Sequence, residues 1–395
     1  MESITIIGSG ASGAILSQSL LAKGFKVTCL DGGKKPNPKL KLPNQDFCTI
    51  RKTSKDQKKF FLGQSLEGIP SDGVKIGAQL TPPRKYLIED THDKFKSAGN
   101  FQGMTSLATG GLTGGWGAAA FTFIPQEWQQ VGLEKNMTPY YNSLVKLVGI
   151  SGPSSDITNS EFAYQLEGLQ KPLPHDTNAQ SILNKYQRLK GQHKLKIGRS
   201  FLASLSEDKG QRKKNSLYDT EFWDNPNQSV FRTQDLIQDL IKNNKHFKHK
   251  PGFILRAFKE KKDHVNLYVE DSKGYTSTIQ TKNLILCAGA INTGRICLNS
   301  ICHNDSPSTP ILSNPHCYFT NINTSLFGRK NSERRHSLAQ LCGYYQSSYE
   351  DLVSLQFYSY RSLLLFKIIK EIPLAPWAGL IVARALVESL SIIEI

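Results

Sequence analysis

The first 31 residues constrain this chain more than any other feature, because they read as strand, glycine turn, helix and second strand. SITIIG is rich in β-branched residues and ends at a glycine, which is typical of a buried parallel strand. Gly8, Gly10 and Gly13 follow at once with GxGxxG spacing. A helical stretch then runs to Lys23, and FKVTCLD predicts a second strand that ends on Asp31. The pattern predicts the opening unit of a parallel α/β sheet.

Each glycine of this turn has a physical role in a dinucleotide-binding motif. Gly8 permits the tight turn, Gly10 lets the backbone approach a pyrophosphate, and Gly13 lets the helix pack closely on the strand. The free N–H groups at the start of the helix, at Ala11 and Ser12, would face the phosphates. A carboxylate at the tip of the second strand accepts hydrogen bonds from ribose hydroxyls.

A GxGxxG match alone is weak evidence, since glycine-rich turns without a ligand also produce it. Here the strand before it, the helix after it and Asp31 about 20 residues on supply the expected context. This segment by itself leaves NAD and FAD open, while the carboxylate disfavours the 2′-phosphate of NADP.

A second glycine cluster lies in TSLATGGLTGGWGAAAFTF, residues 105–123. Its glycines surround Thr113 and Trp116, and they are Gly110, Gly111, Gly114, Gly115 and Gly117. Backbone this bare can lie flat against a planar ligand and donate hydrogen bonds to it. The alternative is a close-packed chain crossover with no ligand.

A third block, KNLILCAGAINTGRICLNS, spans residues 282–300 and predicts a buried strand, a turn of small residues and a helix. GFILRAF and HVNLYVED precede it as a period-two hairpin, which we expect the turn Ser272–Lys273–Gly274 to close. Together these strands predict the far half of one nucleotide-binding sheet.

The three blocks, in this order, resemble the glucose–methanol–choline (GMC) oxidoreductases, in particular a short bacterial branch associated with cell-surface polysaccharide gene clusters. The blocks that carry the resemblance are IIGSGASGAILSQSLLAKGFKVTCLDGG, GGLTGGWGAA and ILCAGAINTGRICLNS, and the SLAQ segment at Ser337–Gln340 also fits. The likeness covers these blocks well and the remainder of the chain thinly.

The resemblance implies an FAD whose pyrophosphate lies on Gly8–Gly13 and whose ribose lies at Asp31. Its ring would follow Gly110–Gly117, its adenine would lie near the backbone of Phe253–Leu255, and the third block would close over it. The residues that it implies for the cofactor are Gly8, Gly10, Ala11, Ser12, Gly13, Asp31, Gly32, Gly111, Thr113, Trp116, Gly117, Ile254, Ala288 and Gly289. The family's chemistry is oxidation of a sugar or alcohol hydroxyl by hydride transfer to the flavin.

The resemblance fails at the catalytic end. Family members carry a catalytic His, usually with a second His or Asn, in a block after a final hydrophobic helical region. Here that region, RSLLLFKIIKEI and then PWAGLIVARALVESLSIIEI, is followed by the end of the sequence at Ile395, and no histidine follows His336. We therefore expect a C-terminally truncated member and assign no catalytic residue. His316 and His336 are the remaining candidates, but for both an ordinary surface or capping histidine is favoured.

Apolar residues of the tail recur at three- and four-residue steps, which predicts one buried face of two helices. They are Leu363–Leu365, Ile368–Ile369, Leu380–Val382, Leu386–Val387 and Leu390. The alternative is that this surface is exposed and drives association or membrane adhesion.

Composition bounds the remaining possibilities. Basic residues outnumber acidic ones by 49 to 33, and they concentrate in residues 34–59, 185–214 and 242–250. No nucleic-acid module surrounds these stretches, so we interpret them as solvated loops, with membrane or polyanion contact as the alternative. Seven cysteines without a CxxC pair indicate a reducing compartment. With neither a signal-peptide pattern nor a spanning segment, cytoplasmic is the expected location, and no zinc-ligand spacing predicts a metal.

The expected fold class is α/β: a Rossmann-like FAD domain with an interleaved α+β substrate domain. We expect residues 1–130 and 215–305 in the FAD domain and residues 131–214 and 306–395 in the substrate domain. The sequence therefore predicts an FAD-dependent oxidoreductase acting on a small sugar or alcohol. The alternatives are a catalytically incomplete FAD-fold protein and a peripheral, basic nucleotide-binding module.

Overall fold

The computed structural model divides the chain into two compact units. Unit 1 comprises residues 1–41, 82–116 and 232–314, and unit 2 comprises residues 42–81, 117–231 and 315–395. The structure describes residues 2–36, 44–55, 82–88, 103–123, 125–133, 136–154, 166–189, 194–302, 307–312, 317–329, 334–346, 352–359, 376–386 and 389–395.

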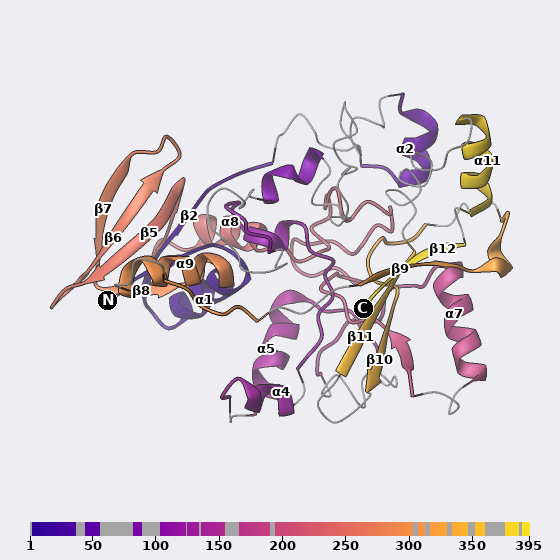
Figure 1. The fold of residues 1–395 in the computed structure, drawn as a ribbon, viewed down its shortest axis with the longest axis horizontal. Coiled ribbons are helices and arrows are strands. Elements are labelled where there is room, and N and C mark those ends of the chain that lie inside the picture. The colour runs from indigo at the N-terminus through magenta and orange to yellow at the C-terminus, as the bar shows by residue number, and fades with distance from the viewer. Residues whose placement is uncertain are drawn as a thin grey trace. The chain divides into compact units, whose positions relative to one another are not determined.

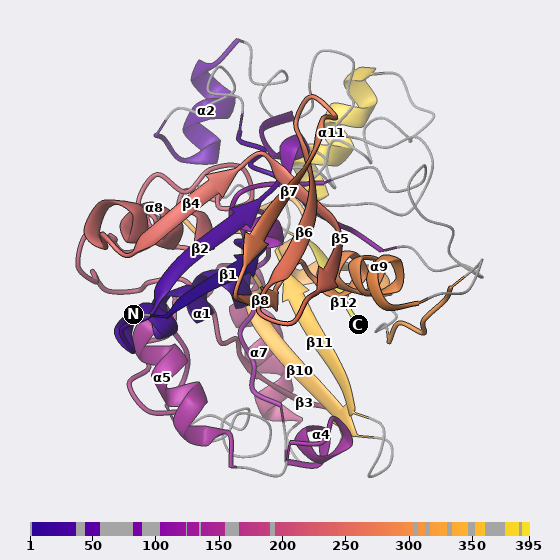
Figure 2. The same cartoon turned by 90° about the vertical axis from the view of Figure 1, so that its left-hand side faces the viewer.

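A parallel sheet forms the centre of unit 1. Its strands are β1 (Ser3–Ile7), β2 (Lys26–Asp31), β4 (Phe247–Pro251) and β8 (Asn283–Leu286), in the order β4-β2-β1-β8 (Figure 2). The two strands that were predicted on either side of the glycine turn pair in parallel from Ser3↔Lys26 to Ile7↔Leu30. The carboxyl ends of all the strands therefore lie at one edge of this sheet.

Three helices accompany this sheet: α1 (Ala11–Ala22), α8 (Thr233–Asn243) and α9 (Ala290–Ile301). α1 packs against β1 and β2, and α8 packs against β4 and α1. The predictions of a helix after the glycine turn and of a second one after NLILCAG are confirmed.

The hairpin strands do not join the parallel sheet, and that part of the prediction is wrong. β5 (Phe253–Glu260), β6 (Val265–Asp271) and β7 (Thr276–Thr281) form a separate antiparallel sheet (Figure 2). The turn at residues 272–274 closes β6 onto β7 and not β5 onto β6, because Gly274 N donates to Asp271 O over 3.1 Å.

A hydrophobic core cluster joins these elements of unit 1. Ile7 and Leu30 of the parallel sheet pack with Leu255 and Leu267 of the antiparallel sheet and with Ile296 of α9. All five side chains are at most 5% exposed. Both sheets of unit 1 therefore turn one face of their alternating side chains toward a shared core.

Unit 2 contains a five-stranded antiparallel sheet in the order β3-β10-β11-β12-β9. Its strands are β3 (Lys196–Arg199), β9 (Tyr318–Ile322), β10 (Leu341–Gln346), β11 (Leu352–Tyr358) and β12 (Leu390–Glu394). Helix α7 (Thr177–Arg188) lies along this sheet (Figure 1), and its Ala179 and Leu183 pack on Ile197 and Leu341.

Shorter elements complete the described chain. In unit 1 they are the 3-10 helices η3 (Pro82–Leu87) and η4 (Gly111–Gly114); in unit 2 they are α2 (Phe47–Thr53), α4 (Pro125–Gln130), α5 (Thr138–Val148), η5 (Thr324–Leu326) and α11 (Pro376–Leu386).

The tail prediction is partly wrong. Residues 376–386 are helical, but Leu390 lies in β12 between β11 and β9 and is buried as a strand residue. Trp377 and Ile381 of α11 are 68% and 59% exposed. The apolar positions at residues 363–369 lie outside the described residues.

The chain is thus a mixed α/β protein with one parallel and two antiparallel sheets. Residues 42–81, 117–130 and 215–231, which we expected in the first domain, group with unit 2, and residues 306–314 group with unit 1. No helix in the described part of the chain is long and apolar enough to cross a membrane.

Candidate functional site

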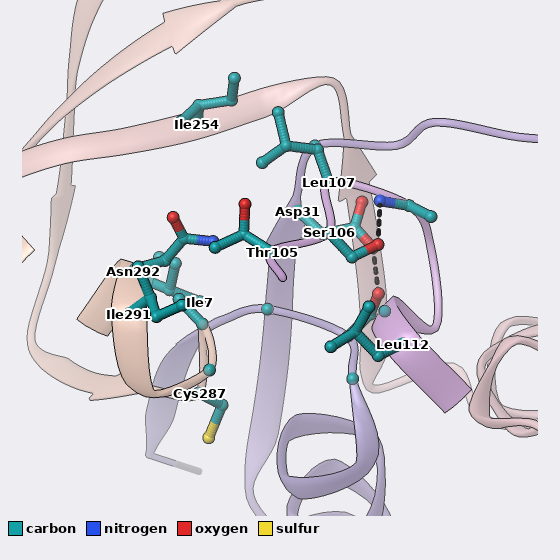
Figure 3. Close-up of a pocket in the computed structure, with 18 of the residues that line it drawn as sticks. Ile7, Asp31, Thr105, Ser106, Leu107, Leu112, Ile254, Cys287, Ile291 and Asn292 are labelled. Carbon is teal, nitrogen blue, oxygen red and sulfur yellow. Dashed lines mark hydrogen bonds between the residues drawn. The ribbon is translucent and has the colours of Figure 1, made fainter. Parts of the chain in front are cut away.

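A pocket of about 430 Å³ lies in unit 1, at the carboxyl ends of β1, β2 and β8. The turns after these strands line it, together with residues 104–113 and the start of β5. In Figure 3 Asp31 and Ser106 lie on one side of it and Ile291 and Asn292 on the other. The carboxyl edge of a parallel sheet is where α/β proteins bind ligands.

The three glycines of the first turn differ in what requires them. Gly8 has φ +98°, and a Cβ on it would collide with Cys287 O; a Cβ on Gly13 would collide with Gly8 O. Both glycines are therefore demanded by packing within the protein. A Cβ on Gly10 would meet no heavy atom within 4 Å, yet Gly10 lines the pocket. Packing within the described residues therefore does not require a glycine at this position of the pocket wall.

Helix α1 points its N-terminus into the pocket without a cap. Its N-cap, Gly10, offers no side-chain hydrogen bond, and its first turn holds no acidic residue. The helix's first internal bond runs from Ala14 N to Gly10 O over 2.9 Å, so the N–H groups of Ala11, Ser12 and Gly13 make no intrahelical bond. Free N–H groups and the positive end of the helix dipole together favour an anion.

A second helix, α9, also begins at the pocket. Its N-cap, Gly289, has φ +79° and no side-chain cap, and its first turn holds no acidic residue. Ala288 and Gly289 line the pocket with Ile291, and Arg295 of the next turn does so as well. Burial lowers the pKa of Arg295 from its ordinary value, with Arg256 acting in the same direction. On this side the pocket is lined by the start of a helix without acidic residues in its first turn and by one arginine.

Asp31 supplies the carboxylate of the pocket and is 6% exposed. Its Oδ2 accepts hydrogen bonds from Ser9 Oγ and from His249 Nε2, the latter over 3.1 Å. Ser9 Oγ in turn accepts from Gly110 N over 2.9 Å. Asp31 Oδ1 is buried and has no hydrogen-bond partner among the described residues. A buried carboxylate oxygen in this state is free to accept from a bound molecule.

The second glycine cluster packs on the first. Gly110 and Gly111 have φ +86° and +59°, and a Cβ on Gly111 would lie 3.2 Å from Gly10 Cα. Thr113 Oγ1 donates to Gly110 O over 2.7 Å, and Thr233 Oγ1 donates to the same carbonyl over 2.9 Å. This clamp fixes the bare backbone beside the glycine turn, so residues 105–113 form a wall of the pocket.

Most residues that were predicted to hold the cofactor come together in this pocket. They are Gly8, Gly10, Ala11, Ser12, Asp31, Gly32, Gly111, Thr113, Ile254, Ala288 and Gly289. Gly13, Trp116 and Gly117 are not among its lining residues. Gly13 packs on Gly8 behind the turn, and a Cβ on Gly117 would lie 3.2 Å from Tyr358 Oη of unit 2.

Sequence reasoning missed Ser9 and His249. His249 was grouped with a solvated basic stretch, because lysines flank it at 248 and 250. In β4 those two lysines are exposed, while the side chain of His249 is 6% exposed. The strand alternation Lys-His-Lys was the available signal, since the middle residue must face the other side of the sheet.

His336 is not the surface or capping histidine that we expected. It is 1% exposed, and burial lowers its pKa to about 4. It belongs to a buried cluster of unit 2 in which Arg335 bonds Asp176 over 2.6 Å and Asp219 over 3.3 Å. Gln340 of the SLAQ segment donates to His336 O over 2.9 Å. None of these residues lines the pocket.

No histidine among the described residues lines the pocket. His316, His92 and His193 lie outside the described residues. His264 bonds the exposed Asp263 over 2.7 Å. In the part of the chain that the structure describes, no group of three or more His, Cys, Asp or Glu side chains could hold a metal ion.

Comparison with known proteins yields no assignment: no protein-family model matches the chain, and no curated protein sequence matches it.

Proposed function

We propose that the chain is an FAD-binding protein of the GMC type, with a Rossmann-like unit 1, and that it oxidises a sugar or alcohol hydroxyl. The observation that supports nucleotide binding is that Gly10 and Asp31 line the same pocket. Gly10 leaves the uncapped start of α1 open to the pocket. Asp31 has a buried carboxylate oxygen that has no hydrogen-bond partner among the described residues.

The residues present fit a dinucleotide. The N–H groups of Ala11 and Ser12 would hold the diphosphate, because they are donors without intrahelical partners at the positive end of α1. Asp31 Oδ1 would accept from the ribose. Phe253, Ile254 and Leu255 at the start of β5 would offer an apolar wall for the adenine. FAD in preference to NAD rests on the resemblance of the three sequence blocks.

When bound, the flavin would supply the hydride acceptor, and this chain's residues would bind and orient it. Unit 2 is the proposed substrate unit. We assign no base to it, because the buried His336 holds no position at the pocket and its lowered pKa keeps it neutral.

A visible spectrum of the purified protein, before and after incubation with FAD, tests the proposal. We expect flavin absorption bands that remain with the protein through gel filtration. Gly10→Val should lose them while keeping its far-ultraviolet circular dichroism, because the new side chain fills the pocket and not the fold. Wild-type protein that stays colourless after incubation with FAD contradicts the proposal.

A catalytically incomplete flavoprotein is the second candidate, and it is favoured by the absence of any histidine from the described residues that line the pocket. Anaerobic addition of sugars and alcohols separates the two candidates. Bleaching of the flavin bands by one of them supports the oxidase or dehydrogenase, whereas bands that only dithionite bleaches support the incomplete form.

A further inference from the structure

Strand β4 brings one histidine to the acid of the pocket. Lys248 and Lys250 are exposed, and His249 between them is turned to the buried side. β4 pairs in parallel with β2, with His249 opposite Cys29. Asp31 lies two residues beyond Cys29, on the same face of the sheet, so the imidazole reaches the carboxylate diagonally across the strand pair.

The hydrogen bonds give Asp31 one defined orientation. Oδ2 meets His249 Nε2 at 3.1 Å and also receives the Ser9 hydroxyl. Because a carboxylate oxygen only accepts, His249 presents Nε2 as a donor. Gly110 N fixes the Ser9 oxygen from the other side over 2.9 Å. Two side chains from separate segments of unit 1 therefore bond the carboxylate through one oxygen, and a third segment fixes one of these side chains.

The other oxygen, Oδ1, is left without a partner among the described residues, although its residue is buried and lines the pocket (Figure 3). Leaving a buried acceptor unpaired is unfavourable, and the arrangement around Oδ2 prevents the carboxylate from rotating to relieve it. A pair of neighbouring hydroxyls entering the pocket would relieve it.

We propose that His249 is a positioning residue for ribose recognition. By occupying Oδ2 it directs Oδ1 of Asp31 toward the 2′- and 3′-hydroxyls of an adenine nucleotide. This inference rests on the proposed function, because it takes the pocket to hold the ADP portion of a dinucleotide. His249 itself touches Asp31 and not the ligand.

A ligand-truncation experiment separates this role from simple packing. Protein freed of bound nucleotide is titrated in a calorimeter with ADP and with 2′,3′-dideoxy-ADP, which lacks both hydroxyls. Hydrogen bonds to a charged group are worth about 1.5–3 kcal/mol, so wild-type protein should prefer ADP by about 10- to 100-fold. His249→Leu should lose most of this preference by weakening ADP binding, with dideoxy-ADP binding unchanged.

Two further variants complete the test. His249→Gln keeps an N–H donor and should restore most of the preference. His246→Leu is the matched control, because it removes a histidine three residues away while leaving the His249–Asp31 hydrogen bond in place, and it should behave as wild type. If His249→Leu does not fold, His249→Phe fills the same space without a donor and gives the same comparison.

The outcomes are distinct. A wild-type preference for ADP that His249→Leu and His249→Phe retain, or equal losses for both ligands, overturns the positioning role and leaves the proposed function standing. Wild-type protein that binds neither nucleotide overturns the proposed function and this inference with it. Loss of the preference in His249→Leu and its return in His249→Gln support the inference.

Discussion

Both units bury carboxylates, but they satisfy them differently. In unit 2, Arg335 lies between Asp176 and Asp219, and the Asp176 carboxylate also accepts from Ala179 N at the start of α7. In unit 1, the Asp31 carboxylate is held through Oδ2 alone, and its Oδ1 faces a pocket without a partner among the described residues. In unit 2 one guanidinium bonds both carboxylates, as in a structural ion-pair network, whereas no arginine or lysine bonds Asp31 among the described residues and its Oδ1 has no partner there. Burial of a carboxylate alone therefore does not indicate a binding site. A buried carboxylate oxygen without a hydrogen-bond partner at a pocket is the more informative feature.

The largest effect should come from removing the cation of the Arg335 network in unit 2. Arg335→Leu removes the cation between Asp176 and Asp219 and leaves two buried carboxylates facing each other. The free energy of unfolding, measured by urea denaturation, should fall by about 3–5 kcal/mol. Lys213→Met, which removes only the exposed ion pair with Asp208, is the control and should leave the midpoint unchanged. A fall of less than about 1 kcal/mol for Arg335→Leu would show that Arg335 does not stabilise the two buried carboxylates as described.

The second largest effect on stability should come from Gly13, where close packing of α1 on the glycine turn leaves no room for a Cβ. Gly13→Ala places a Cβ against Gly8 O and forces α1 away from β1. We expect a loss of about 2–3 kcal/mol of stability, measured by thermal denaturation, because neither backbone can move without disturbing the sheet. An unchanged melting temperature would mean that helix and strand do not approach this closely.

The pH dependence of stability tests the histidines of unit 2. Burial, with Arg199 as a smaller cause, lowers the pKa of His175 from 6.5 to about 4. Between these values the unfolded chain binds a proton that the folded chain does not, so the stability from neutral His175 is present above pH 6.5 and is lost as the pH falls toward 4.

His175→Gln removes this titration. The loss of unfolding free energy between pH 7 and pH 5 should then shrink by about 2 kcal/mol relative to wild type. Burial raises the pKa of Asp219 to about 6, which changes stability with pH in the opposite direction. Because this contribution is present in wild type and in His175→Gln alike, the difference between their pH profiles isolates His175. Identical pH profiles for the pair would show that His175 titrates as an exposed histidine.

The smallest effect on stability should accompany a large effect on binding. Gly10→Ala adds a Cβ where no heavy atom lies within 4 Å, at a backbone φ of −63° that alanine also adopts. We expect the unfolding free energy to fall by no more than about 1 kcal/mol, because alanine is a poorer N-cap than glycine. ADP affinity, measured by calorimetry, should fall at least about tenfold, because the added Cβ would stand where the diphosphate approaches the turn. Unchanged affinity would place the ligand elsewhere.

Local sequence patterns predicted the elements that line the pocket. The strand, turn, helix and strand of residues 3–31 depend on spacing within a few residues, and each was found where the pattern placed it. The same holds for the NLILCAG strand and for α9, whose start is marked by small residues.

Features that depend on distant partners were not predictable in this way. LSIIE is apolar enough for a helix and becomes β12 because β11 and β9 offer edges on both sides. The contact of His249 with Asp31 depends on the pairing of β4 with β2, which lie more than 200 residues apart in sequence. Likewise, the two acids that surround Arg335 come from residues 116 and 159 positions away, so its burial could not be read from its basic neighbourhood.

The central claim is that the open oxygen of Asp31 and the uncapped start of α1 recognise one nucleotide. A crystal structure of the protein with ADP tests it most directly. The account predicts the diphosphate within hydrogen-bond distance of Ala11 N and Ser12 N, and a ribose hydroxyl on Asp31 Oδ1, with His249 still on Oδ2. A nucleotide bound away from Gly10, or a ribose that leaves Oδ1 unpaired, would contradict it.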